Sequence, residues 1–226
     1  MESTEDRFAD GYNHLTTSDE TSVTKRYRGP DASTRRTREA TVLRAIASVV
    51  PVPALLDEGE DYVTMRLMPG AHGRELLEPD TAAPVLAACG RMLARVHAVP
   101  PAVLPLPGQG VLVHGDFTPA NVIFGDGLRE ITAVLDWESA HLGRPVEDLA
   151  WCEWSVRTHR PDCVPALPHL YHGYGIQRPV WPVLRGAMLS RIRELVDFHS
   201  RDESERGRAL LADWRRRMAI TSGWRG

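Results

Sequence analysis

The chain has 226 residues, of which 42% are hydrophobic and 25% are charged, with a formal net charge of −3. This length supports one large domain or two small lobes around a real core, and the mildly acidic balance without a basic run argues against a nucleic-acid partner. The acidic start has no apolar signal segment, no stretch approaches the roughly 18 apolar residues of a membrane span, and the three cysteines show no CxxC spacing, so we expect a cytoplasmic protein.

The first part of the chain reads as short strands around one helix. Residues 12–17 and 22–27 are expected to pair as a hairpin. A helix follows, with Asp31 or Ser33 as its N-cap, and it should end before Pro51.

A second pair of strands precedes a break in the pattern. Residues 54–58 and 62–67 read as strands that flank a turn, and the sequence MPGAHG at 68–73 is a candidate hinge. We therefore divide the chain into an N-terminal nucleotide-binding lobe, 1–68, and a C-terminal catalytic and substrate-binding lobe, 69–226.

The second part is mainly helical, with a few strands near its beginning. We expect strands over 111–113, 121–124 and 131–135, and helices over 81–99, 146–157, 163–174, 180–200 and 203–220. The fold class is therefore α+β, with a small strand-rich lobe and a larger helical one.

Oxygen-bearing side chains gather where the short strands of the second part end. Asp116 and Asn121 lie on the loop between two buried strands, and the third strand ends in LDWE, which presents Asp136. Carboxylate and amide oxygens suit Mg²⁺, and a carboxylate that is not fully used by a metal can accept a proton from an attacking hydroxyl. Phosphoryl transfer needs this combination.

Two segments resemble the aminoglycoside phosphotransferase and choline kinase family. HGDFTPAN (114–121) is similar to the HGDxxxxN loop of that family, with Gly115 where protein kinases carry arginine. LDWESAHLGRPVEDLAW (135–151) resembles its IDWE and DLA segment. The resemblance covers roughly residues 12–157 and implies a bilobal protein-kinase-like fold with a shortened N-terminal lobe.

The resemblance also implies a role for each matching residue. Asp116 would be the catalytic base that orients the acceptor hydroxyl. Asn121 and Asp136 would hold Mg²⁺ between the phosphates of ATP or GTP. Asp148 would tie the backbone of the loop to the following helix, and we expect His114 to be hydrogen-bonded within the loop.

Lys25 is the only lysine among the 27 lysines and arginines, and it lies within a strand pattern. Kinase-like folds need a strand lysine on the α- and β-phosphates, braced by a glutamate from the following helix. Glu39 shares a helix face with Val42, Leu43 and Ile46. Because an unpaired carboxylate on such a face is costly, we expect Glu39 to pair with Lys25.

The nucleotide base is expected to lie against the segment that joins the lobes, where backbone groups could read a purine edge. The candidate residues are Met65, Arg66, Leu67 and Met68. The sequence does not distinguish adenine from guanine.

Two features depart from the family pattern. Before Lys25 the only glycine is Gly11, so the glycine-rich phosphate loop is missing, and the candidate replacement is the turn TTSDE at 16–20. Arg144 stands where the family usually has the aspartate of GDP. The missing loop leaves open how the protein would bind the phosphates of the nucleotide.

The acceptor is expected to be small. Only eleven residues separate Asp136 from Asp148, which leaves no room for the activation segment of a protein kinase. Trp151 and Trp154 read as core residues. Candidate acceptor contacts are Glu138, His141, Glu153 and Asp197, and carboxylates would suit a cationic acceptor such as an aminoglycoside.

Three functions fit these patterns. The leading one is an O-phosphotransferase that moves the γ-phosphate of ATP or GTP to a hydroxyl of an antibiotic-like acceptor, with antibiotic resistance as its role. A metabolite kinase for an amino alcohol, sugar or nucleoside is the second, and a degenerate kinase-like binding protein is the third. The joint presence of the catalytic, metal and lysine–glutamate residues argues against the third. The sequence gives no oligomeric state.

Overall fold

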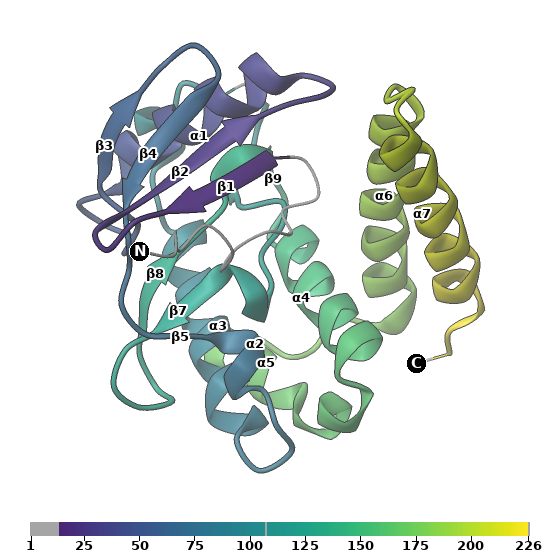
Figure 1. Cartoon of the computed structure of the whole chain (residues 1–226). Helices are drawn as coiled ribbons and strands as arrows, with labels where there is room; N and C mark the ends of the chain where they lie inside the picture. The colour runs from purple at the N-terminus through teal and green to yellow at the C-terminus, as the bar shows by residue number, and fades with distance from the viewer. Residues whose placement is uncertain (1–13, 107, 226) are drawn as a thin grey trace, which may run out of the picture.

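The N-terminal lobe is a four-stranded antiparallel sheet with one helix packed against it (Figure 1). The computed structural model describes residues 14–106 and 108–225. The strands are β1 (His14–Ser18), β2 (Ser22–Tyr27), β3 (Leu55–Glu58) and β4 (Tyr62–Arg66), and their order across the sheet is β1-β2-β4-β3. The predicted hairpin and second strand pair are therefore present, although residues 12 and 13 lie outside the described ranges.

The helix of this lobe, α1 (Ala32–Ile46), packs an apolar stripe against the sheet. Val42, Leu43 and Ile46 are buried on that stripe together with Glu39, as the helical spacing predicts. Asp31 occupies the N-cap position, but its side chain makes no capping bond. Its carboxylate instead pairs with Arg201, with 2.6 Å between Oδ2 and Nη2.

The predicted hinge segment contributes a strand to the second lobe. In this lobe β5 (Ala71–His72), β7 (Val122–Phe124) and β8 (Ile131–Val134) form one antiparallel sheet, and β6 (Val111–Val113) pairs with β9 (His141–Gly143). Since β4 ends in one sheet and β5 begins in another, we keep residue 68 as the proposed lobe boundary.

Helices make up the rest of the second lobe. They are α2 (Gly73–Leu76), α3 (Ala82–His97), α4 (Val146–His159), α5 (Pro168–Tyr174), α6 (Trp181–Ser200) and α7 (Glu205–Gly223). Short 3₁₀ turns are η1 (Pro101–Val103), η2 (Pro119–Asn121), η3 (Trp137–Ser139) and η4 (Pro161–Ala166). Figure 1 shows α6 and α7 as an antiparallel pair on the side of α4.

The helix predicted over 163–174 is divided in two. Residues up to Ala166 form the 3₁₀ turn η4, and α5 starts at Pro168. Proline lacks an N–H and clashes with the preceding turn inside a helix, but it is well suited to a first turn. Pro165 and Pro168 therefore break the continuous helix that the apolar pattern indicated.

None of the helices in the described ranges is long and apolar enough to cross a membrane.

Candidate active site

The loop between β6 and β7 carries His114, Gly115 and Asp116, and a buried carboxylate fixes its backbone. Asp148, on α4, accepts hydrogen bonds from the backbone N–H of His114 at 2.8 Å and of Gly115 at 2.9 Å. His97, on α3, lies against the same carboxylate, with 3.0 Å between its Nε2 and Oδ2 of Asp148. Although burial opposes the charge, these hydrogen bonds hold the pKa of Asp148 below its ordinary value.

His114 is a hydrogen-bonding element of the loop. The backbone N–H of Asp116 donates to its Nδ1 at 3.1 Å, so the ring proton is on Nε2. That nitrogen donates to the carbonyl oxygen of Leu135 at 2.8 Å. The fully buried imidazole therefore links this loop to the end of β8.

Gly115 is required by the close approach of another segment. Its φ of +80° lies in the left-handed region, and a Cβ there would come 2.5 Å from the carbonyl oxygen of Ser139. This explains why a residue with a side chain, such as the arginine of protein kinases, does not fit here.

The Asp116 carboxylate is held by donors from two directions. The indole Nε1 of Trp151 donates to Oδ1 at 2.7 Å, and Nδ2 of Asn121 donates to Oδ2 at 3.0 Å. Burial raises the pKa of Asp116, while the charge of Arg191 and the bond from Trp151 act in the opposite direction. The group can therefore accept a proton more readily than a solvated aspartate.

Lys25 lies at the centre of three carboxylates. Its Nζ is 2.8 Å from Oε2 of Glu39, 2.6 Å from Oδ1 of Asp136 and 3.0 Å from Oε2 of Glu138. The pairing with Glu39 that the sequence predicted is present. Burial alone would lower the pKa of Lys25, but the carboxylates hold it well above its ordinary value, so the amine stays charged.

Glu39 connects the two lobes. Its Oε1 accepts from the backbone N–H of Trp137 at 3.1 Å, and its other oxygen accepts from the hydroxyl of Tyr27 as well as from Lys25. Trp137 directly follows Asp136. The helix of the first lobe is thus tied to the segment that presents a candidate metal ligand.

The candidate metal ligands fit a hard cation. Asp136 has a φ of +66°, an uncommon conformation for a residue other than glycine and one often found at functional sites. Asn121 uses Nδ2 toward Asp116, which leaves Oδ1 as its candidate metal-binding atom. The backbone N–H of Leu135 donates to the carbonyl of Asn121 at 2.8 Å, so both ligands lie on adjoining segments. An amide and a carboxylate oxygen suit Mg²⁺.

A family comparison agrees with this geometry. The family model described as "Phosphotransferase enzyme family" (APH) matches residues 7–110 and 105–187. The chain belongs to this phosphotransferase family.

Solved structures of similar fold cover most of the chain. The GDP and kanamycin complex of APH(2")-IIia is 13% identical, covers 95% of this chain and 91% of its own, and gives a TM-score of 0.69. Macrolide 2'-phosphotransferase MphH from Brachybacterium faecium is 20% identical, with coverage of 95% and 88% and a TM-score of 0.58. At these identities the likeness establishes the kinase-like bilobal fold, in agreement with the sequence prediction.

A curated relative is much longer than the chain. Acyl-CoA dehydrogenase family member 10 from Mus musculus is 28% identical, and the match covers 50% of the chain but only 16% of the relative. About half of the chain therefore corresponds to a small part of that protein.

Two of the predicted acceptor contacts are engaged elsewhere. Glu138 is buried and pairs with Lys25 and with Arg35, whose Nη1 lies 3.2 Å from Oε1. Glu153 is fully buried, and Arg178 and Tyr171 donate to it at 2.6 Å and 2.5 Å. An internal cation pairs with each carboxylate in the structure, and their roles as acceptor contacts stay proposals.

The remaining predicted acceptor contacts are at more accessible positions. His141, on β9, has its Nε2 2.9 Å from Oε2 of Glu147, and Asp197 is exposed on α6. These two residues stay as proposals.

The predicted hinge residues leave the first sheet as an extended segment. Met65 is buried and Arg66 is exposed at the end of β4, and Leu67 and Met68 are half-buried beyond it. The N–H of Leu67 donates to the carbonyl oxygen of Thr21 at 2.9 Å. A nucleotide base would therefore have to use other backbone groups of this segment.

The turn proposed as a phosphate loop is in the wrong place. Ser22 pairs with Arg66 at the hinge end of β2, whereas Lys25 lies further along the strand opposite Val63. The side chain of Asp19 also occupies the turn's amides, accepting from Thr21 and Ser22 at 2.7 Å each. A strand preceding β1 would fall before residue 14, and Gly11 lies outside the described residues.

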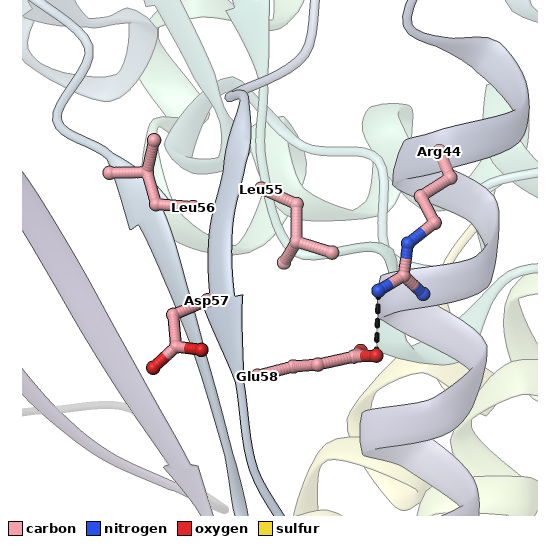
Figure 2. A pocket seen from close by; sticks show the side chains of 5 residues that line it. All are labelled: Arg44, Leu55, Leu56, Asp57 and Glu58. Atoms are coloured by element: carbon pink, nitrogen blue, oxygen red, sulfur yellow. Dashed lines mark ion pairs between the residues drawn. The ribbon is translucent and has the colours of Figure 1, made fainter.

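A hollow on the first lobe lies away from these residues. It measures about 310 Å³, and Figure 2 shows Leu55 and Glu58 of β3 directed toward Arg44 of α1. The charged groups of Arg44 and Glu58 are 2.6 Å apart. Because they neutralise each other and no catalytic residue lines the hollow, we do not assign it to the reaction.

Sequence reasoning missed the hydrogen bond from the indole of Trp151 to Asp116. Trp151 and Trp154 are buried, as expected of core residues. A buried tryptophan N–H normally finds an acceptor, and this rule was the signal that could have prompted a search for one.

Proposed function

We propose that the chain is an O-phosphotransferase that moves the γ-phosphate of ATP or GTP to a hydroxyl of a small molecule. The observation that carries this proposal is the convergence of Asp116, Asn121, Asp136 and Lys25 from three separate segments of the chain, namely the loop between β6 and β7, the end of β8, and β2. Membership of the phosphotransferase family supports it.

The proposed mechanism gives each of these groups one task. Lys25 would bind the α- and β-phosphates, with Glu39 keeping its amine oriented. Asn121 and Asp136 would hold Mg²⁺, which supplies charge neutralisation on the phosphates. Asp116 would accept the proton of the acceptor hydroxyl and direct its oxygen toward phosphorus.

The acceptor belongs to one of two classes. An aminoglycoside or related antibiotic, with a role in antibiotic resistance, is the first. A metabolite such as an amino alcohol, sugar or nucleoside is the second, and the use of Glu138 and Glu153 in internal ion pairs favours it. The charge of Arg191 near Asp116 also favours an acceptor that is not a polycation.

A nucleotide-consumption screen tests the proposed function. Purified protein with Mg²⁺ and either ATP or GTP is mixed with hydroxylated antibiotics, amino alcohols, sugars and nucleosides, and nucleoside diphosphate and phosphorylated product are measured. We expect consumption that depends on an acceptor. Nucleotide binding without acceptor-dependent consumption would favour the degenerate binding protein instead.

We predict that Mg²⁺ binds weakly until a nucleotide supplies further oxygen ligands. Two protein ligands leave most of the octahedral shell of Mg²⁺ to water, and the Lys25 amine competes for Asp136. Calorimetry should detect feeble binding of Mg²⁺ alone and much tighter binding with ADP or GDP present. Asp136→Asn should remove that enhancement, and tight stoichiometric Mg²⁺ binding by the protein alone would contradict the ligand assignment.

A further inference from the structure

We propose that Trp151 is a positioning residue for the catalytic base, acting through its indole N–H on Asp116. This inference rests on the proposed function, in which Asp116 is the base. The Nε1 to Oδ1 distance is 2.7 Å, and Trp151 is 3% exposed. The bond is therefore short and sheltered from competing water.

The indole suits this task because it can donate a hydrogen bond but cannot accept one. It interacts with the carboxylate as a fixed donor and cannot take the transferred proton away. Asn121 holds the other oxygen of Asp116 at 3.0 Å. With donors on both oxygens, rotation of the carboxylate is restricted, and its remaining lone pairs keep one direction.

An aromatic stack keeps the indole in place. The ring of Trp151 stacks on that of Trp154 with 4.4 Å between centroids and an interplanar angle of 4°. Trp154 in turn donates from Nε1 to Oγ1 of Thr221 at 3.0 Å, and Trp214 packs against both rings at 6.1 Å and 5.7 Å.

Thr221 and Trp214 belong to α7, which lies beyond the last residue matched by the family model. The chain's last helix thus supports the base through two tryptophans. Arg191 of α6 also lies over the ring of Trp151, 5.9 Å from its centroid.

NMR spectroscopy tests the bond without any turnover. The variant Trp151→Phe identifies the indole proton of Trp151 in the wild-type spectrum. We expect this resonance to lie downfield and to shift in Asp116→Asn, because the substitution replaces the carboxylate acceptor of the indole N–H with an amide. A resonance that keeps its position in Asp116→Asn overturns the inference, whether or not the screen finds an acceptor.

Kinetics then test the catalytic consequence. Turnover is followed with the acceptor found in the screen, or as nucleotide hydrolysis by water where none is found. Trp151→Phe removes one of the two donors that restrict the Asp116 carboxylate. We expect kcat to fall about 10-fold, which matches the typical strength of such a bond, with the nucleotide KM unchanged.

Trp181→Phe is the matched control. The Nε1 of Trp181 is buried, and within the described ranges it has no hydrogen-bond partner, so this variant makes the same change without altering a donor to Asp116. Its kcat and nucleotide KM should match those of the wild type. An unchanged kcat in Trp151→Phe, or an equal loss of kcat in Trp181→Phe, overturns the positioning role. Wild-type protein without any phosphotransfer overturns the proposed function instead, and the NMR result still decides the bond.

Discussion

Asp116→Asn is expected to lower turnover by about 10²–10⁴-fold, the usual contribution of a positioned base. The amide keeps the shape of the side chain and can still accept one of the bonds from Trp151 or Asn121. It cannot accept a proton, and it lacks the negative charge. Turnover with the identified acceptor measures the effect, while calorimetry should find nucleotide binding retained.

The pH dependence of turnover is a second test of Asp116 as the base. A base works in its ionised form, and burial raises the pKa of Asp116 above its ordinary value. Wild-type activity should therefore fall as pH decreases through this raised pKa, at a higher pH than for a solvated aspartate. The residual activity of Asp116→Asn should lack this limb.

Asp126→Asn is the control for that experiment. Asp126 is an exposed residue in the turn between β7 and β8, so the same chemical change there should leave turnover and pH profile unaltered. An Asp116→Asn protein with a rate near the wild type would show that the base is another group.

Asp148→Ala is expected to lower the free energy of unfolding by about 3–5 kcal/mol, as when one partner of a buried charged network is removed. The carboxylate is fully buried, and its loss leaves the N–H groups of His114 and Gly115 without an acceptor. Urea titration at neutral pH measures the change.

The stability difference should depend on pH in a defined direction. The pKa of Asp148 is lowered in the folded protein, so its contribution is complete above the unfolded value of about 3.9. This stabilising contribution is lost as pH falls through the pKa of Asp148 in the folded protein. The difference in free energy of unfolding between wild type and Asp148→Ala should therefore decrease only under strongly acidic conditions.

Asp162→Ala serves as the comparison for stability. Its side chain is half-exposed and lies 3.7 Å from Arg160 in a surface pair, and such pairs contribute about 0–1 kcal/mol. If Asp148→Ala destabilised the protein no more than Asp162→Ala, the proposed support of the catalytic loop would be wrong.

The sequence by itself determined the features that depend on local order. The apolar spacing from Glu39 to Ile46 places these residues on one helix face whatever surrounds the helix. In the same way, Asp116 and Asn121 are fixed on one short loop between strands. The lone lysine and the inward glutamate were enough to predict their pairing, because a buried carboxylate requires a cation.

Only the tertiary structure decided the hydrogen-bond or ion-pair partner of each remaining polar group. From the sequence alone, Glu153 is a helix carboxylate that could contact the acceptor. In the structure, Arg178 from a distant segment pairs with it. Trp151 is a core residue, as the sequence predicted. Its indole N–H nevertheless donates a hydrogen bond to Asp116, which lies 35 residues earlier in the sequence. Local spacing sets the direction of a side chain relative to its own helix or strand. The partner opposite it is set by how separate elements pack together, and short-range patterns do not record that packing.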